Sequence, residues 1–430
     1  MSKNRIAIVE GYRTPMGKMG GSLAPLAADQ IGAQIFREIY ERFSDYDAEI
    51  SEVIIGNVAQ PAHAANIARV IALRAGVPRS VPAFTVHRNC ASGMEAVTSA
   101  ISKIQAGHAE IILAGGVESM SNIPLLFPGE MKLFLEQLAR SRSAAAKLKQ
   151  LSKFKLKYLK PVIGLKLGLT DPVCNMIMGN TAEVLAQDFS ISRKDQDLFA
   201  MQSHNRAEQA AEQGIFQEEI IPFPVGTKKV SMLAADEGIR KGQNMQALTK
   251  LKPFFDRRNG TVTAGNSSQI TDGGAALLVM SEKKAKEIGA KPLGYIKDFS
   301  YAGLDPARMG LGPAYAIAQL VKKHKLKIRD IDLFEINEAF AVQVLACVQA
   351  LNSKKYCTES LGLKDKFGEI ANDKLNVNGG AIALGHPVGM SGTRIIIHLL
   401  RELKRRKLKR GVASLCIGGG QGGAVLLEVN

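Results

Sequence analysis

AEISEVIIGNVAQ (residues 48–60) is a polar turn followed by an apolar run that ends at Asn57. Much later, IRDIDLFEINEAF (residues 328–340) repeats this pattern and ends its run at Asn337. HRNCASGMEA and AEIILAGG follow the first stretch, while NGGAIALGHPVGMSGTR and RGVASLCIGGG follow the second. Each series predicts a strand, a polar loop, a glycine-rich turn into a helix and a second strand. The strands lack clean polar alternation, which indicates that both sheet faces are covered. We infer an internal duplication of an α/β unit.

The duplication predicts the domain organisation. Residues 1–121 and 254–281 would form the first α/β half, and residues 282–430 would form the second. Residues 122–253 differ in character, because they contain capped helical patterns and a strongly basic stretch. We expect them to form an inserted domain.

The composition indicates a large globular protein. The chain has 430 residues, of which 46% are hydrophobic, and no apolar run reaches the ~18–20 residues that a membrane-spanning helix needs. The N-terminal stretch resembles neither a secretory signal nor an amphipathic presequence, so we expect a cytoplasmic protein, or one whose targeting segment has already been removed. The five cysteines show no CxxC or Cys/His spacing. This pattern disfavours a metal site and a disulfide framework, and leaves each cysteine to be judged as a thiol.

Two stretches hold much of the formal charge of +16. Residues 131–168 carry ten Lys and Arg against one Glu, with Leu, Phe and Tyr between them in LSKFKLKYLK, and residues 401–410 carry seven against one. Such a segment suits an anionic membrane surface or a partner subunit, or it is a solvated face over an acidic ligand. We expect peripheral membrane or partner contact through 131–168. Nucleic acid is not expected, because aromatic stacking motifs and zinc knuckles are lacking and the chain has no Trp.

Cys90 stands where an apolar run ends and a helix is predicted to begin, in SGMEAVTSAISKIQAG. A nucleophilic cysteine reacts as thiolate, whereas a free thiol has a pKa near ~8.5. A helix N-terminus and a nearby imidazole both lower that value. The small residues after Cys90 leave room for a substrate, and their N–H groups could bind an oxyanion. By itself the stretch fits a small buried residue at a tight junction equally well.

The second half supplies an imidazole and a second thiol. His386 follows a glycine-rich strand end, at a position that corresponds to the neighbourhood of Cys90, so the two converge if the halves pack about a pseudo-twofold axis. Cys416 ends a strand before three glycines, where a thiol can act as acid or base toward a carbon acid. Asn337 could hold a water that donates to an oxyanion, or it could cap the next helix.

Four motifs together resemble the thiolase family: NCASGMEA around Cys90, NEAF (337–340), GHPVGMSG (385–392) and CIGGGQG (416–422). They span essentially the whole chain in the family's order and spacing. The resemblance implies an α/β fold of five layers, αβαβα, made of two duplicated halves with an inserted loop domain that binds coenzyme A. It also implies an acetyl-CoA C-acyltransferase that uses coenzyme A (CoA) as a substrate, with neither a metal nor another cofactor.

The resemblance assigns roles to individual residues. Cys90 is the acyl-accepting nucleophile, His386 is its base, and Cys416 moves the α-proton of the acetyl unit. Asn337 would order a water that forms one oxyanion hole with His386, while the N–H groups of Cys90 and Gly418 form the other. The remaining assignments concern substrate binding, with Ser268 matching the pantetheine contact and Met178 and Phe340 lining the acyl pocket.

The expected reaction is that of a 3-ketoacyl-CoA thiolase of fatty-acid β-oxidation; the alternative is an acetyl-CoA acetyltransferase that makes acetoacetyl-CoA. The insert resembles that of the trifunctional-enzyme β subunit, a type that usually has His in place of Asn337. The family resemblance also implies a homodimer or tetramer and a complex with a hydratase/dehydrogenase subunit. Rival hypotheses are a ketoacyl synthase, an inactive lipid carrier, and a basic membrane- or nucleic-acid-binding protein without catalysis. The second cysteine argues against the synthase, and the filled catalytic positions argue against the carrier.

Overall fold

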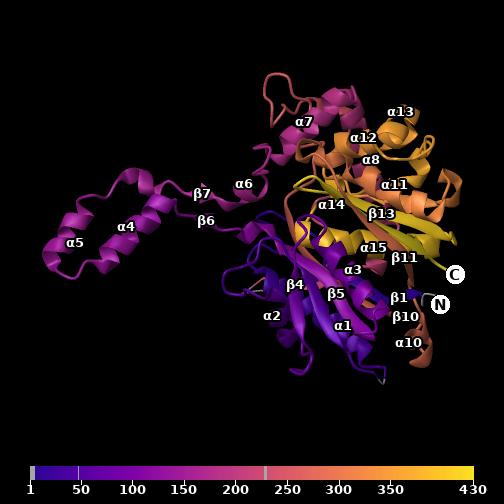
Figure 1. Cartoon of the computed structure of the whole chain (residues 1–430), viewed down its shortest axis with the longest axis horizontal. Coiled ribbons are helices and arrows are strands. Elements are labelled where there is room, and N and C mark those ends of the chain that lie inside the picture. The colour runs from indigo at the N-terminus through magenta and orange to yellow at the C-terminus, as the bar shows by residue number, and fades with distance from the viewer. Residues whose placement is uncertain (1–4, 47, 227–229) are drawn as a thin grey trace. The chain divides into compact units, whose positions relative to one another are not determined.

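The computed structural model describes residues 5–46, 48–226 and 230–430. The chain divides into two compact units, of which the smaller comprises residues 123–170 and the larger contains the rest (Figure 1). The inserted domain expected over 122–253 stays a prediction. Among the described residues, no helix is both long enough and apolar enough to cross a bilayer.

The larger unit is built around a sheet to which both halves of the chain contribute. The strands of the first half are β1 (Ile6–Arg13), β2 (Gly17–Lys18), β3 (Glu52–Gly56), β4 (Ala83–Val86), β5 (Ile111–Ser119) and β10 (Thr271–Ser281). Those of the second half are β11 (Gly294–Gly303), β12 (Leu333–Ile336), β13 (Arg410–Ile417) and β14 (Gln421–Glu428).

Both halves follow the same strand order. In the first half β3 is parallel to β5, β5 is antiparallel to β10, and β10 is antiparallel to β1. The second half repeats this order and these directions in β12, β13, β14 and β11. The halves meet where β1 pairs with β11 over residues 6–8, which makes one continuous sheet in the order β12-β13-β14-β11-β1-β10-β5-β3-β4. The predicted duplication is confirmed.

Helices cover the sheet in the predicted five layers. The first half has α1 (Ala28–Phe43) and α2 (Ile67–Arg74) on its outer face, and the second half has α11 (Gly312–His324) backed by α12 (Ala341–Asn352). Between the halves lie α3 (Ser92–Gln105) and α15 (Val388–Arg405), which pack on each other and on inward-facing strand residues. The hydrophobic core lies in the spaces between these layers, so the starts of α3 and α15 are held in the middle of the unit.

Glycines let the two central helices approach closely at their N-termini. A Cβ on Gly93 would lie 2.6 Å from Thr393 Oγ1 and 2.7 Å from the carbonyl oxygen of Gly389. A Cβ on Gly392 would overlap the backbone of Met94. Any larger residue would push the helices apart, and with them the turns that carry Cys90 and His386.

The remaining elements of the larger unit lie mostly around α12 and the sheet ends. They are α7 (Met178–Asp188), α8 (Arg193–Glu212), α9 (Met245–Thr249), α10 (Glu282–Glu287), α13 (Lys354–Glu359), α14 (Ala381–Leu384) and the small ribbon of β8 (Phe223–Val225) with β9 (Ser231–Leu233). Ser192 caps α8, accepting from the N–H of Asp195, as the sequence indicates.

The smaller unit is a helical hairpin on a two-stranded base. Its elements are β6 (Leu125–Leu126), α4 (Gly129–Arg140), α5 (Ala144–Leu151), a 3₁₀ turn (Leu156–Leu159), β7 (Val162–Ile163) and α6 (Gly164–Gly168), and β6 pairs with β7. Phe134, Phe154 and Tyr158 form a small aromatic cluster with ring centroids 5.4–5.9 Å apart. This cluster is the unit's own core, because Phe134 is the one large apolar side chain there that is fully buried.

Candidate active site

Cys90 lies in the tight turn between β4 and α3. Asn89 adopts a left-handed backbone, with φ of 44°, which Asn tolerates better than most residues. The Ser92 hydroxyl accepts from the N–H of Arg88 at 2.9 Å and donates to the carbonyl of Asn89 at 2.7 Å. The turn therefore holds Cys90 at the start of the helix, half-buried, as the sequence predicts.

The Cys90 thiol is a weak acid at rest. Burial raises its pKa, the backbone N–H groups of Gly418 and of Cys90 itself lower it, and the nearby charge of Glu118 raises it. These two N–H groups are the pair that the sequence analysis assigned to an oxyanion hole, and they converge on the sulfur. A protonated thiol needs a base before it can attack a substrate.

His386 is a buried imidazole with polar side chains at both ring nitrogens. Its Nδ1 lies 2.6 Å from the Ser391 hydroxyl, which donates to the carbonyl of Pro387 at 3.0 Å, so Nδ1 carries the proton. Its Nε2 lies 3.5 Å from the Asn337 amide nitrogen, which can only donate. Burial, then the positive charge of Arg394, lowers the pKa of His386 to about 4. The imidazole is therefore neutral at neutral pH, with Nε2 available to accept a proton.

Asn337 is held directly after β12, where its N–H donates to the carbonyl of Ser414 at 2.9 Å. The next helix, α12, has Phe340 at its N-cap position and no side-chain cap, so Asn337 does not cap it. Its Oδ1 is buried and has no hydrogen-bond partner among the described residues. An acceptor in that state can bind a water, which could in turn donate to an oxyanion.

Cys416 ends β13 beside the glycine run. It is 1% exposed, and burial, then the charges of Cys90 and Cys347, raise its pKa well above the ordinary value. It is therefore a neutral thiol that can donate a proton. The glycine run that follows has positive φ at Gly419 and Gly420, and Asn89 Nδ2 donates to the carbonyl of Gly418 at 2.7 Å.

Ser268, Met178 and Phe340 surround this centre. The N–H of Ser268 donates to the carbonyl of Ala339, next to Phe340, at 2.9 Å, and the following residue, Gln269, accepts from the N–H of His386 at 3.1 Å. A Cβ on Gly418 would lie 3.5 Å from the Met178 sulfur. These contacts link Cys90, Cys416, Gly418 and Met178 on one side, and His386, Asn337, Ser268 and Phe340 on the other, and Asn337 bonds to Ser414, two residues before Cys416.

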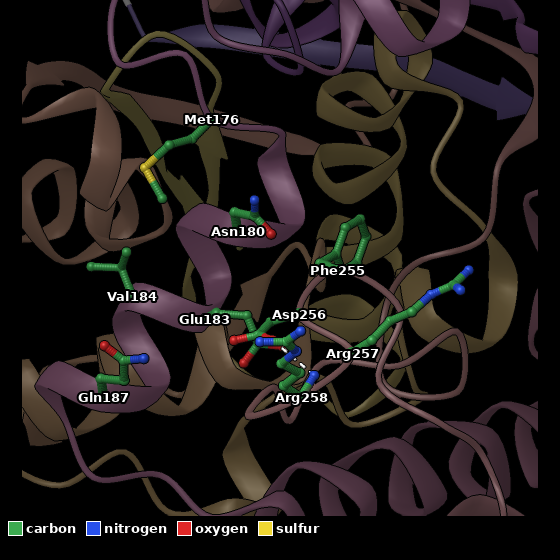
Figure 2. A pocket seen from close by; sticks show the side chains of 9 residues that line it. All are labelled: Met176, Asn180, Glu183, Val184, Gln187, Phe255, Asp256, Arg257 and Arg258. Atoms are coloured by element: carbon green, nitrogen blue, oxygen red, sulfur yellow. Dashed lines mark hydrogen bonds between the residues drawn. The ribbon is translucent and has the colours of Figure 1, made fainter.

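A cavity of about 520 Å³ opens beside α7 (Figure 2). Met176 and four side chains of the helix (Asn180, Glu183, Val184 and Gln187) face residues 255–258 across it. Phe255 joins the cavity to the centre, because its ring stacks edge-on against Phe340 with centroids 6.1 Å apart. Arg257 and Arg258 are exposed, so they can meet an anion there.

Sequence reasoning missed two residues of the centre. Ser391, which fixes the tautomer of His386, stands one turn into the helix that follows the histidine, and that spacing could have indicated it. Glu118, whose charge acts on Cys90, lies in LAGGVES, a stretch that was considered only as a strand and a glycine pair.

Comparisons with known proteins give one consistent result. The family model for the thiolase N-terminal domain matches residues 6–283, and the model for the thiolase C-terminal domain matches residues 290–429. Curated relatives include a probable acetyl-CoA acyltransferase of Staphylococcus epidermidis, 41% identical with 99% of each chain covered. They also include an acetyl-CoA acetyltransferase of Cupriavidus necator, 42% identical with 98% of this chain and 99% of the relative covered.

Similar solved structures include the acetyl-CoA acetyltransferase of Bacillus anthracis, with a TM-score of 0.86, 38% identity and coverage of 100% of this chain and 99% of the other. Human mitochondrial 3-ketoacyl-CoA thiolase in complex with CoA is also similar, with a TM-score of 0.84, 36% identity and coverage of 99% and 98%.

Proposed function

The chain belongs to the thiolase family and is an acyltransferase, and from that premise we propose that it is a 3-ketoacyl-CoA thiolase. Such an enzyme transfers an acyl group from a 3-oxoacyl-CoA to CoA and releases acetyl-CoA. One observation supports the proposal above the others: the charge of Cys90 raises the pKa of the Cys416 thiol, and the buried imidazole of His386 is neutral. That set has one nucleophile, one base and one proton donor for a carbon acid.

In the first step the Cys90 sulfur attacks the 3-keto carbon while its proton passes to His386 Nε2. The negative charge that develops on the oxygen would be met by N–H donors of the glycine run or by a water on Asn337. The carbon–carbon bond then breaks and leaves the acyl group on Cys90. Its electron pair goes to the departing acetyl-CoA enolate, which the Cys416 thiol protonates.

In the second step a CoA thiol enters, passes its proton to the Cys416 thiolate that the first step left, and attacks the thioester on Cys90. The acyl group leaves with CoA, and Cys90 recovers its proton from His386. The thioester of the substrate stabilises the carbanion, so this chemistry needs only the side chains already named.

We place the CoA portion of the substrate along the route from Ser268 to the cavity of Figure 2. Pantetheine would pass Ser268 on its way to Cys90. The nucleotide phosphates would meet Arg257 and Arg258, which are exposed cations at the far side of Phe255. A related human thiolase was solved in complex with CoA, which supports CoA as the ligand.

Chain length and direction of reaction form the finer part of the proposal. Names of the relatives include both acyltransferase and acetyltransferase, so acetoacetyl-CoA synthesis from two acetyl-CoA is the alternative. The test is CoA-dependent cleavage of short-, medium- and long-chain 3-oxoacyl-CoA. We expect kcat/KM to rise beyond the four-carbon substrate, as a β-oxidation enzyme requires. Activity confined to acetoacetyl-CoA would favour the acetyltransferase.

We further propose that residues 131–168 contact an anionic membrane surface. Of the ten cations there, two form ion pairs within the described residues, Lys132 with Glu136 and Lys157 with Glu130. The smaller unit also exposes large apolar side chains, among them Leu148 at 71% and Leu156 at 81%. Exposed apolar groups between unpaired cations match a surface of phosphate headgroups over acyl chains. A hydratase/dehydrogenase subunit is the alternative occupant.

Self-association is proposed at β4, because it is an edge strand of the sheet and all four of its residues are only partly buried. An unpaired edge with Phe84 and Val86 can pair with the same edge of a second copy. Light scattering should therefore give a dimer or tetramer that Phe84→Glu weakens; a monomeric wild type would contradict this. Cytoplasmic location and the lack of nucleic-acid binding stay predictions.

A further inference from the structure

Glu118 is a fully buried carboxylate at the end of β5 that the mechanism above does not use. Its Oε1 accepts from the Asn57 amide and the N–H of Ala59, and its Oε2 accepts from the N–H of Val58, each at 3.0 Å. A fourth donor, also at 3.0 Å, is the N–H of Gly389. Four donors on one buried carboxylate make a built site for a negative charge.

Strand register makes Glu118 the counterpart of Cys416. In the parallel pair of the first half, Gly56 stands opposite Gly116, and Asn57 follows Gly56. In the parallel pair of the second half, Ile336 stands opposite Ser414, and Asn337 follows Ile336. Two residues past Gly116 is Glu118, and two past Ser414 is Cys416.

The antiparallel pairs give the same correspondence. Glu118 stands opposite Gly273 in DGGAALL, and Cys416 stands opposite Gly422 in QGGAVLL, which occupy matching places in the two repeats. The first half therefore has a carboxylate where the second half has the proton-donating thiol, and in each half the strand end beside it carries an asparagine.

Glu118 also joins the two halves at the catalytic centre. Three of its donors belong to the first half, whereas Gly389 lies in the first turn of α15, three residues after His386. The contact is tight, because a Cβ on Gly389 would lie 2.5 Å from the carbonyl of Val117 and 2.7 Å from Glu118 Oε2. A shift of this carboxylate would move the start of α15, and His386 with it, relative to Cys90.

We propose that Glu118 is a positioning residue for the acyl-transfer reaction, which fixes the start of α15 against the loop after β3 and whose negative charge acts on the Cys90 thiol. The charge opposes formation of the thiolate until His386 takes the proton, so Cys90 rests as a neutral thiol. The proposal rests on the role of Cys90 as nucleophile given under the proposed function.

The electrostatic environment of Glu118 is defined on every side. Burial raises the pKa of Glu118 to about 7, although the four hydrogen-bond donors lower it. Glu118 is therefore fully charged at the alkaline pH where Cys90 ionises. The groups that face it are the Asn57 amide and two N–H groups of the loop after β3 and one N–H of α15, and the titratable group that it acts on is Cys90. The remaining ionisable groups at the centre are His386 and Arg394, on or before α15, and Cys416 on β13.

Two variants separate position from charge. Glu118→Gln keeps the size but removes the charge and presents an amide N–H₂ to backbone donors, whereas Glu118→Asp keeps the charge on a shorter arm. Iodoacetamide alkylation of Cys90, followed by peptide mass spectrometry across pH, reports ionisation of the thiol without any substrate. Turnover is measured separately as acetoacetyl-CoA thiolysis, so a wrong substrate assignment would not affect the alkylation result.

We expect Glu118→Gln to shift the alkylation midpoint of Cys90 to lower pH by about one unit, because a nearby negative charge is lost. The same variant should lower kcat at least ~10-fold, because the base His386 is no longer held in position. Glu118→Asp should lower kcat with a midpoint close to wild type. Glu338→Gln is the control, since Glu338 is also a buried carboxylate with a raised pKa but does not act on Cys90, and its midpoint should stay unchanged.

Loss of turnover in Glu118→Gln without a shift of the midpoint would overturn the proposal, because loss of packing alone would then explain it. Wild-type kcat in both variants would overturn it as well. Circular dichroism and the melting temperature identify a variant that fails to fold, in which case Glu118→Asp carries the test of position through kcat.

Discussion

Cys90 and Cys416 have different surroundings although both have a raised pKa. Cys90 is half-buried and the backbone N–H groups of Gly418 and of Cys90 itself lower its pKa, whereas Cys416 is 1% exposed and, among the described residues, only its own backbone lowers its pKa. The first arrangement suits a nucleophile that bears charge for part of the cycle. The second suits a thiol that must hold a proton until a carbanion forms.

This division predicts a split between two half-reactions. Cys416→Ala should lower cleavage of acetoacetyl-CoA roughly 100-fold or more, the usual effect of removing a proton donor. It should still exchange labelled CoA into acetyl-CoA, because that exchange needs only Cys90 and its base. Cys90→Ala should lose both activities. Loss of both in Cys416→Ala, with the fold intact, would contradict the assignment.

His386 predicts a pH dependence of stability. Its pKa is about 4 in the folded protein against an ordinary value near 6.5, so the unfolded chain binds the proton more readily. The contribution of His386 to stability is therefore complete above pH 6.5 and is lost as the pH falls toward 4, by roughly 3 kcal/mol. Denaturant unfolding at several pH values should show this loss. In His386→Gln the free energy of unfolding should change less steeply with pH over this range. A slope equal to that of the wild type would refute the buried neutral imidazole.

At the scale of single elements, the basic hairpin offers a direct test of membrane contact. Lys153→Glu, Lys155→Glu and Lys160→Glu combined should weaken binding to phosphatidylserine vesicles by about 100-fold or more, because each lysine near an anionic surface contributes about 1 kcal/mol. Acetoacetyl-CoA thiolysis should remain at the wild-type level. Vesicle sedimentation and activity assays measure the two quantities.

A matched control comes from the other basic run, residues 401–410. Lys404→Glu, Lys407→Glu and Lys409→Glu make the same change of net charge elsewhere in the chain, so an effect of total charge alone would appear in both triple variants. If both bind vesicles as wild type does, membrane contact through 131–168 is wrong. Loss of a co-purified hydratase/dehydrogenase subunit in the first variant alone would then identify the partner.

For the whole molecule, the duplication could be predicted from sequence because each half repeats its strand and loop pattern in order. Asn57 and Asn337 ended matching strands in the prediction, and in the structure each directly follows the matching strand. The convergence of Cys90 and His386 followed from that symmetry alone. It is realised through glycine contacts between α3 and α15, which no local pattern encodes.

Other features could not be predicted from local patterns. The joining of the halves at β1 and β11 depends on strands almost 300 residues apart in sequence. The compact hairpin of residues 123–170 depends on Phe134 meeting Phe154 and Tyr158, whereas its apolar and basic residues fitted a helix and a strand equally well. Glu118 was missed because it occupies the position that corresponds to Cys416 but has a different side chain, and only the strand register reveals the correspondence.

The central claim is that an acyl group is carried on Cys90. The direct measurement is rapid acid quenching of the enzyme with acetyl-CoA, followed by proteolysis and mass spectrometry of the cysteine-containing peptides. The account predicts one acetyl group on the peptide that contains Cys90, removed by added CoA and missing in Cys90→Ala. Acetylation of Cys416 instead, or equal labelling of the Cys90→Ala variant, would contradict it.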